Sequence, residues 1–182
     1  MSIGTEFLQT AIRRLKYYRE LGDNTFRQLA PEDFHFRPDP NSNSLAIIIQ
    51  HLSGNMLSRW TDFLNTDGEK PSRSRDKEFT AQENRLAELL QLWEDGWNCF
   101  LNTLAGLKEE DLLKTVYIRK EPLLVIDAIN RQLAHYPYHV GQIVFLGKLI
   151  KGNAWENLSI PPGASEQYNT ADGLKDPAKK FQ

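Results

Sequence analysis

The sequence has few of the residues on which most cofactor chemistry depends. Among its 182 residues there are one cysteine, Cys99, and only four histidines. A single cysteine excludes an internal disulfide framework and any metal site built from several thiolates, and it is typical of a reducing compartment. The 22 basic and 24 acidic side chains give a formal net charge of −2, without the basic excess of a protein that neutralises nucleic-acid phosphates. We therefore expect no nucleic-acid partner.

Long hydrophobic runs are also lacking. The apolar run 143–146 is followed by Gly147 and Lys148, and no stretch approaches the roughly 20 apolar residues that cross a bilayer. The first residues become charged without the apolar core of a signal peptide. We therefore expect a soluble, cytoplasmic protein with no membrane partner.

What the sequence does contain is helical periodicity. Thr80, with Glu83 three residues later, has the pattern of a capping box, and Pro122 stands at a favoured first position of a helix. Apolar residues recur every three or four positions in four segments. These segments cover about residues 3–21, 44–64, 80–101 and 122–151.

The organisation predicted from these segments is all-α. Residues 115–118 could be extended, but they are too few to argue for a sheet. We expect a four-helix bundle over residues 1–152, because four amphipathic helices must bury their apolar faces against one another. An irregular, extended tail, 153–182, is expected to pack on the bundle or on a partner subunit.

Two features outside the histidines have a functional and a structural interpretation. Arg73, Arg75 and Lys77 lie in a loop and could form a small anion site, but a solvated loop is the favoured interpretation. Cys99 lies inside the third helical segment, with no cationic neighbour evident, so a packed thiol is favoured over a nucleophile.

Three histidines fall in segments predicted to be buried helices. His135 and His139 are four residues apart, so their Cβ atoms lie on one helix face about 6 Å apart. His51 lies in the second segment, and Asn55 and Asp62 share its strip at the edge of the predicted core. Spacing alone leaves two interpretations open, a shared metal ion or histidines that only pack.

The residues around the histidine pair add to the first interpretation. Pro137 removes one backbone hydrogen bond and should bend the helix, either for function or for packing. Gln142 shares the face of His135 and His139, where its amide could orient a ligand ring. His35 lies in a proline-flanked connection and is expected not to be a ligand.

The run 134–142, Ala-His-Tyr-Pro-Tyr-His-Val-Gly-Gln, resembles the last-helix signature His-x-x-x-His-x-Gly-Gln of the DinB/YfiT-like superfamily. Gln50-His51-Leu52 resembles the other ligand position of that superfamily. Residues 57–63 and 159–163 look like those of a bacterial subfamily with no assigned function. The resemblance covers nearly the whole chain.

This resemblance implies a four-helix bundle, often a homodimer, that binds a divalent ion through three histidines. Carried over residue by residue, the implied ligands are His51, His135 and His139, and the implied ion is Zn²⁺ or Ni²⁺. The superfamily includes thiol S-transferases that use low-molecular-weight thiols such as bacillithiol or mycothiol, and also maleylpyruvate isomerase. No feature of this sequence selects one of these activities.

The function predicted from these residues is that of a metal-dependent enzyme. Three imidazoles leave a position on the ion for water or substrate, as in catalytic rather than structural sites. The leading hypothesis is action on a small electrophile, by thiol S-transfer or hydrolysis. No general base is evident, so a non-catalytic module that binds a metal or ligand, and a structural dimer, remain as alternatives. Candidates for supporting the site are Asn55, Asp62, Tyr138 and Gln142.

Overall fold

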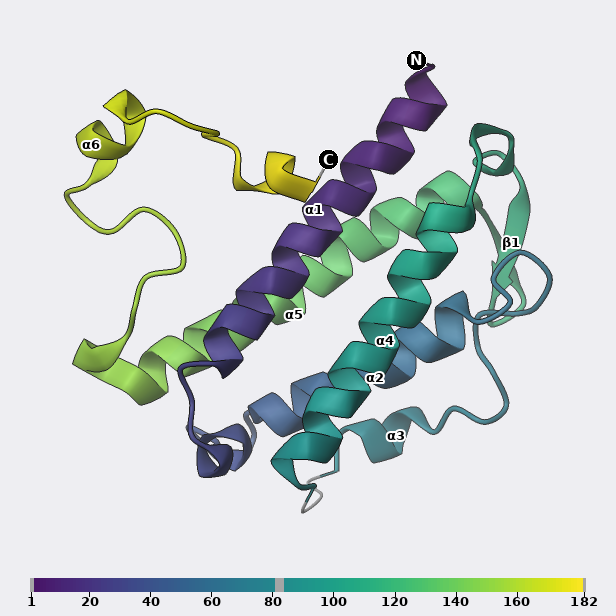
Figure 1. Cartoon of the computed structure of the whole chain (residues 1–182). Helices are drawn as coiled ribbons and strands as arrows, with labels where there is room; N and C mark the ends of the chain where they lie inside the picture. The colour runs from purple at the N-terminus through teal and green to yellow at the C-terminus, as the bar shows by residue number, and fades with distance from the viewer. Residues whose placement is uncertain (1, 81–83, 182) are drawn as a thin grey trace.

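The computed structural model describes residues 2–80 and 84–181, and it is mostly helical, with 64% of the chain in helices (Figure 1). The long helices are α1 (Ile3–Phe26), α2 (Leu45–Trp60), α4 (Leu86–Gly106) and α5 (Val125–Lys151). The short elements are η1 (Pro31–His35), α3 (Arg75–Glu78), η2 (Glu109–Asp111), β1 (Thr115–Ile118), β2 (Glu121–Leu124), η3 (Gly152–Ala154), α6 (Ser165–Thr170) and η4 (Pro177–Phe181).

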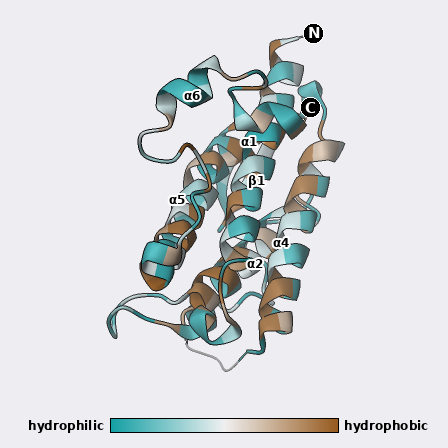
Figure 2. Ribbon diagram, turned by 60° about the vertical axis from the view of Figure 1, so that its left-hand side comes forward, coloured by the Kyte–Doolittle hydropathy of each residue, from teal (hydrophilic) through white to brown (hydrophobic). Residues whose placement is uncertain are grey.

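The four long helices pack around one apolar core. Helix α2 lies along α4 and α1 lies along α5, while α1 also contacts α4 and α2 also contacts α5. Hydrophobic and hydrophilic residues alternate along the ribbons of α4 and α5, as expected for helices with one buried face (Figure 2). The largest fully buried side chains include Trp60, Trp97, Phe100 and Tyr136.

The predicted helical segments are present, but two of them, α4 and α5, begin later than expected. Helix α4 begins at Leu86, where the Glu88 carboxylate accepts a hydrogen bond from the Arg85 backbone N–H at 2.8 Å. The capping box predicted at Thr80 and Glu83 involves Glu83, which lies outside the described residues. The start predicted at residue 80 is therefore wrong, and α4 begins six residues later.

The all-α prediction is also wrong in one region, where β1 and β2 form an antiparallel hairpin. Pro122 pairs with Tyr117 in this hairpin, so α5 begins at Val125 rather than near Pro122. The two turn residues, Arg119 and Lys120, have φ angles of 56° and 64°. Hairpin turns of this kind usually carry Asn or Gly, so Arg-Lys gave no turn signal in the sequence.

The segment after α5 turns away from α5 and returns to α1 (Figure 1). Near its end, the Arg14 guanidinium donates to both Asp176 carboxylate oxygens at 2.7 Å. Lys180 forms an ion pair with Glu20, also on α1. These two ion pairs connect the final turn, η4, to the first helix.

Within the part of the chain that the structure describes, no helix has both the length and the apolar character needed to cross a membrane.

A buried hydrogen-bond chain fixes α5 against α2. The Tyr136 hydroxyl accepts from Trp60 Nε1 and donates to Asn55 Oδ1, both at 3.0 Å. Replacing Tyr136 by phenylalanine leaves a buried donor and a buried acceptor without this partner, so we expect the free energy of unfolding to fall by about 1–3 kcal/mol. Urea unfolding of the purified variant measures this change. The matched control is Tyr138→Phe, because Tyr138 is 62% exposed and its loss should change stability by less than about 0.5 kcal/mol.

Candidate metal centre

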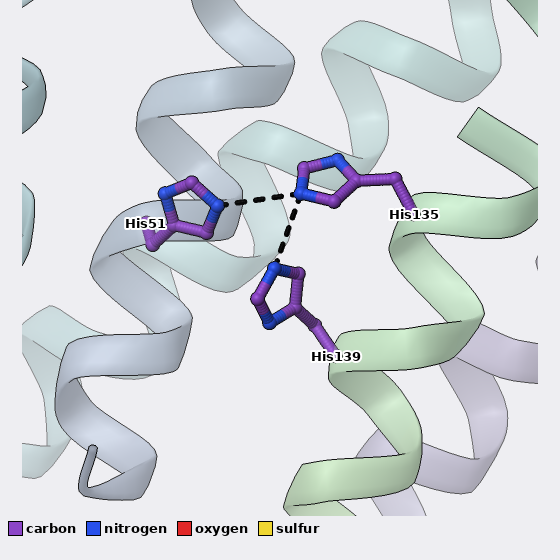
Figure 3. Close-up of side chains that lie close together, drawn as sticks. All are labelled: His51, His135 and His139. Atoms are coloured by element: carbon purple, nitrogen blue, oxygen red, sulfur yellow. Dashed lines mark hydrogen bonds between the residues drawn. The ribbon is translucent and has the colours of Figure 1, made fainter. Parts of the chain in front are cut away.

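The three histidines singled out in the sequence meet between α2 and α5, with their rings turned toward one another (Figure 3). His135 Nε2 lies 3.1 Å from His139 Nε2 and 3.4 Å from His51 Nε2. One ring nitrogen from each histidine lies within 4.8 Å of the other two. His51 and His139 are buried and His135 is partly buried. Two helices therefore bring three potential nitrogen ligands to one point.

The opposite nitrogen of each ring faces an oxygen. His51 Nδ1 lies 3.0 Å from a Glu78 carboxylate oxygen, and His139 Nδ1 lies 2.9 Å from Gln142 Oε1. His135 Nδ1 lies 3.3 Å from Gln132 Oε1. Because an oxygen acceptor at Nδ1 favours the proton there, the neutral form of each ring has its Nε2 lone pair directed at the common point.

Glu78 is the strongest of these acceptors, because it is buried and held by a guanidinium. Arg73 donates to it through Nε at 2.7 Å and through Nη2 at 2.9 Å. Burial by itself would raise the pKa of the Glu78 carboxyl, but the hydrogen bonds from His51 and Arg73 lower it below its usual value. An ionised carboxylate only accepts hydrogen bonds, so His51 Nδ1 must be the donor.

A glycine allows this carboxylate to approach α2. A Cβ atom built on Gly54, one turn after His51, would lie 2.8 Å from Glu78 Cδ and would overlap its carboxylate. The carboxylate has little freedom to move away, because Arg73 and His51 hold both of its oxygens. Gly54 is therefore required by the close approach of α3 to α2.

The two nitrogen separations that His135 makes fit a divalent transition-metal ion. Two ligands at about 2.1 Å from one ion are about 3.4 Å apart in tetrahedral geometry and about 3.0 Å apart as octahedral neighbours. The two Nε2 separations from His135, 3.1 and 3.4 Å, span this range. They are compatible with either geometry and do not select the metal.

His135 and His139 are also in the protonation state that a metal needs. Burial, followed by the fields of His139 and His51, lowers the pKa of His135 to about 3. Burial likewise lowers the pKa of His139. Both imidazoles are therefore neutral near pH 7, the form that coordinates metal.

The lowered pKa of His135 predicts how the stability of metal-free protein depends on pH. Between about pH 6.5 and pH 3 the unfolded chain binds a proton at this residue and the folded chain does not, so acid favours unfolding. We expect the free energy of unfolding to fall by about 1–3 kcal/mol from pH 6.5 to pH 4.5, a window above the pKa of most carboxyls. Urea titrations across this range measure it. In His135→Ala the decline should become shallower; an equally steep decline would contradict the assignment.

The structure brings two of the supporting candidates to the centre and leaves two elsewhere. Gln142 contacts His139, and Asn55 lines the cavity beside the histidines. Asp62 does not lie with them, because α2 ends at Trp60 and the exposed Asp62 carboxylate accepts from Asn65 at 2.7 Å. The exposed Tyr138 packs its ring 5.0 Å from the His139 ring, measured between centroids, but it does not line this cavity.

Two further residues lie away from the centre, as expected. His35 is exposed, and its Nε2 is 3.0 Å from the Asn84 carbonyl oxygen. The partly buried Cys99 thiol lies 3.5 Å from Thr61 Oγ1. Neither side chain lines the cavity of the three histidines.

Sequence reasoning missed Glu78 and misjudged Arg73. The sequence favours a solvated loop around Arg73, but the Arg73 side chain is only 4% exposed and is paired with Glu78. The only available signal was charge complementarity, an Arg and a Glu five residues apart in a loop. That pattern is too common to predict a buried pair.

Comparison with known families identifies a matching family model. A family model described as "Protein of unknown function (DUF1572)" matches residues 2–164, which include the four long helices and all three histidines. No curated protein matches the chain.

Proposed function

This chain belongs to the DUF1572 family of proteins of unknown function, and we propose that it is a metal-dependent enzyme. The proposed ligands of the metal are His51, His135 and His139, and the metal is a divalent transition ion, with Zn²⁺ and Ni²⁺ as the leading candidates. The proposed reaction is the attack of a thiol or of water on a small electrophile.

The observation that carries this proposal is the direction of three lone pairs. Each Nδ1 faces an oxygen, so in the neutral form of each ring the Nε2 lone pair points at the other two rings, and His135 Nε2 lies 3.1 and 3.4 Å from the other two Nε2 atoms. Such an arrangement is repulsive by itself and becomes favourable around a cation. Histidines that only pack would gain from donating to one another, which needs a different tautomer.

The proposal has an architectural part. We take residues 1–152 as a DinB-like four-helix bundle and residues 153–182 as its tail. A homodimer is supported by exposed apolar side chains on α5, where Phe145 is 66% and Leu149 is 50% exposed. The cytoplasm is the compartment we propose, in keeping with the single cysteine.

The protein's own groups have defined tasks in this scheme. When bound, the ion would lower the pKa of a coordinated water or thiol so that a nucleophile is present near neutral pH. Glu78, Gln132 and Gln142 hold the three ligand rings from behind. The cavity beside the rings, of about 390 Å³, provides room for a small substrate.

A second candidate function is a non-catalytic module that senses a metal or a small ligand. The observation that favours it is that no Asp or Glu among the described residues lines the cavity, so a carboxylate general base is missing. Turnover separates the two candidates, since a module of this kind binds without converting its ligand.

The experiment begins with metal analysis of untagged protein, for which we expect about one divalent ion per chain. Conjugation of L-cysteine to 1-chloro-2,4-dinitrobenzene is then followed before chelation, after chelation and after return of the metal. The enzyme hypothesis expects turnover that disappears on chelation and returns with metal. Stoichiometric metal without turnover favours the sensing module. Absence of metal contradicts the enzyme hypothesis and the metal-sensing form of the module.

A further inference from the structure

The cavity beside the three histidines is strongly cationic. It has a volume of about 390 Å³, and five arginines contribute to its lining. These arginines come from α2, from the segment before α3, from α3 itself, from the hairpin turn and from α5. They are Arg59, Arg73, Arg75, Arg119 and Arg131.

Two of the five are buried and support the structure. The Arg73 side chain is 4% exposed and forms an ion pair with Glu78. The Arg59 side chain is 5% exposed, and its guanidinium lies 2.8 Å from a Glu69 carboxylate oxygen. Glu69 also lies 3.5 Å from Arg73 and 3.3 Å from Arg119. One carboxylate therefore serves three guanidinium groups.

The other three arginines are solvent-accessible, and their positive charge is not fully neutralised by carboxylates of the described residues. Arg75 lies over the Phe79 ring, with its guanidinium carbon 5.0 Å from the ring centroid. Neither Arg75 nor Arg131 has a carboxylate partner among residues 2–80 and 84–181, and Arg119 shares Glu69 with two others. Among the described residues, these five guanidinium groups pair with two carboxylates, Glu69 and Glu78, which leaves an excess of three positive charges before any metal is bound.

Arg119 lies in the hairpin turn, and hydrogen bonds from the backbone of this turn to Asp67 hold it in place. One Asp67 carboxylate oxygen accepts from the Arg119 backbone N–H at 2.9 Å, and the other accepts from Lys120 N–H at 2.7 Å. The Gly68 N–H also donates to the Tyr117 carbonyl at 2.8 Å. The loop that contains Glu69 thus anchors the hairpin tip and its arginine at the cavity.

We propose that Arg75, Arg119 and Arg131 bind an anionic small molecule, bearing carboxylate or phosphate groups, beside the three histidines. Guanidinium groups match both kinds of oxyanion in a two-pronged geometry, and a cavity of about 390 Å³ accommodates a molecule of metabolite size. The inference names the substrate class of the proposed metal enzyme and so rests on that function for its catalytic meaning. The binding itself depends only on the arginines.

The test is calorimetric titration of untagged, metal-free protein in 0.15 M NaCl. The probes are L-malate, a dicarboxylate, and inorganic phosphate, with neutral 1,2,4-butanetriol as the control ligand. We expect L-malate or phosphate to bind and butanetriol not to bind. Replacing Arg75, Arg119 or Arg131 by glutamine should weaken binding about tenfold or more, since each removes a charged hydrogen-bond donor.

The matched control is Arg27→Gln, because Arg27 bonds Asn24 at the end of α1 and does not line the cavity. It should bind the probes as the wild type does. Malate binding alone assigns a carboxylate ligand and phosphate binding alone assigns a phosphorylated one. No binding by either probe, or equal affinity in the three cavity variants, overturns the inference.

The same titrations in His135→Ala protein separate this inference from the metal hypothesis. Arginine-dependent anion binding that persists in a protein without metal supports the anion site even if the metal hypothesis fails. Conversely, one metal ion per chain in the arginine variants, together with no anion binding in the wild type, overturns only the anion site.

Discussion

Replacing His135 by alanine is expected to lower the metal content of the untagged protein from about one ion per chain to less than about a tenth of that. His135 Nε2 is the central nitrogen of the cluster, 3.1 Å from one partner and 3.4 Å from the other. Its removal leaves two ligands on different helices, and two imidazoles hold a divalent ion far more weakly than three. Elemental analysis after dialysis against metal-free buffer measures the change.

The same variant should lose the stabilisation that metal gives to the folded state. An ion that binds only the folded protein stabilises it by about 4 kcal/mol when it is present at a thousand times its dissociation constant. Thermal unfolding with and without added ZnCl₂ should therefore show a rise in Tm for the wild type and almost none for His135→Ala. The two readouts are independent, because the first counts ions and the second measures their coupling to folding.

A matched control is available in the fourth histidine. His35 lies in η1 with its Nε2 near the Asn84 carbonyl, so His35→Ala should keep full metal content and the full rise in Tm. If His35→Ala and His135→Ala lost metal equally, or if neither did, the three-histidine site would be wrong.

The long helices and the histidine cluster were predictable because both follow from local rules. Apolar spacing fixed the buried faces of α2 and α5, and a separation of four residues placed His135 and His139 on one face. Bringing His51 to them required only that α2 and α5 pack against each other. The resemblance of residues 134–142 to a known signature added the specific pairing with residue 51.

Asp62 shows where this local reasoning fails. The helical period continued to residue 64 in the sequence, so Asp62 was assigned to the strip of His51. Helix α2 ends at Trp60 instead, and Asp62 adopts a φ angle of 48° just beyond it. A pattern of apolar residues does not define a helix end to within a few residues, and the error moves a side chain off its face.

The support of the site was unpredictable for a different reason. Glu78 reaches His51 across 27 residues, and Asp67 reaches the hairpin turn across more than 50. Both carboxylates lie in a polar, proline-containing stretch with no periodicity. Their positions depend on tertiary contacts, such as the close approach allowed at Gly54, that single-sequence patterns do not contain.

Replacing Glu78 by glutamine is expected to weaken metal binding about 10–100-fold while all three ligands remain. Glutamine keeps an oxygen that can accept from His51 Nδ1, but it removes the negative charge that makes this ring a stronger ligand. The Arg73 side chain is only 4% exposed, and the substitution removes the carboxylate with which its guanidinium is paired. Because an unpaired buried charge is costly, the metal-free protein should lose about 3 kcal/mol of unfolding free energy.

Competition titration with a chromogenic chelator measures the metal affinity, and urea unfolding of metal-free protein measures the stability. Glu110→Gln is the control, since Glu110 is 70% exposed and pairs only loosely with Lys108. It should leave both quantities unchanged. Gly54→Ala tests the same contact by another route, because the added methyl group displaces an intact carboxylate from His51.

The combination of results distinguishes positioning from general destabilisation. If Glu78 acts on the ring of His51, Glu78→Gln and Gly54→Ala should both weaken metal binding, although only the first removes a charge. If Glu78 serves stability alone, affinity measured well below the unfolding temperature should match the wild type once folding is complete. Unchanged affinity in both folded variants would contradict the assignment of Glu78 as the group that orients His51.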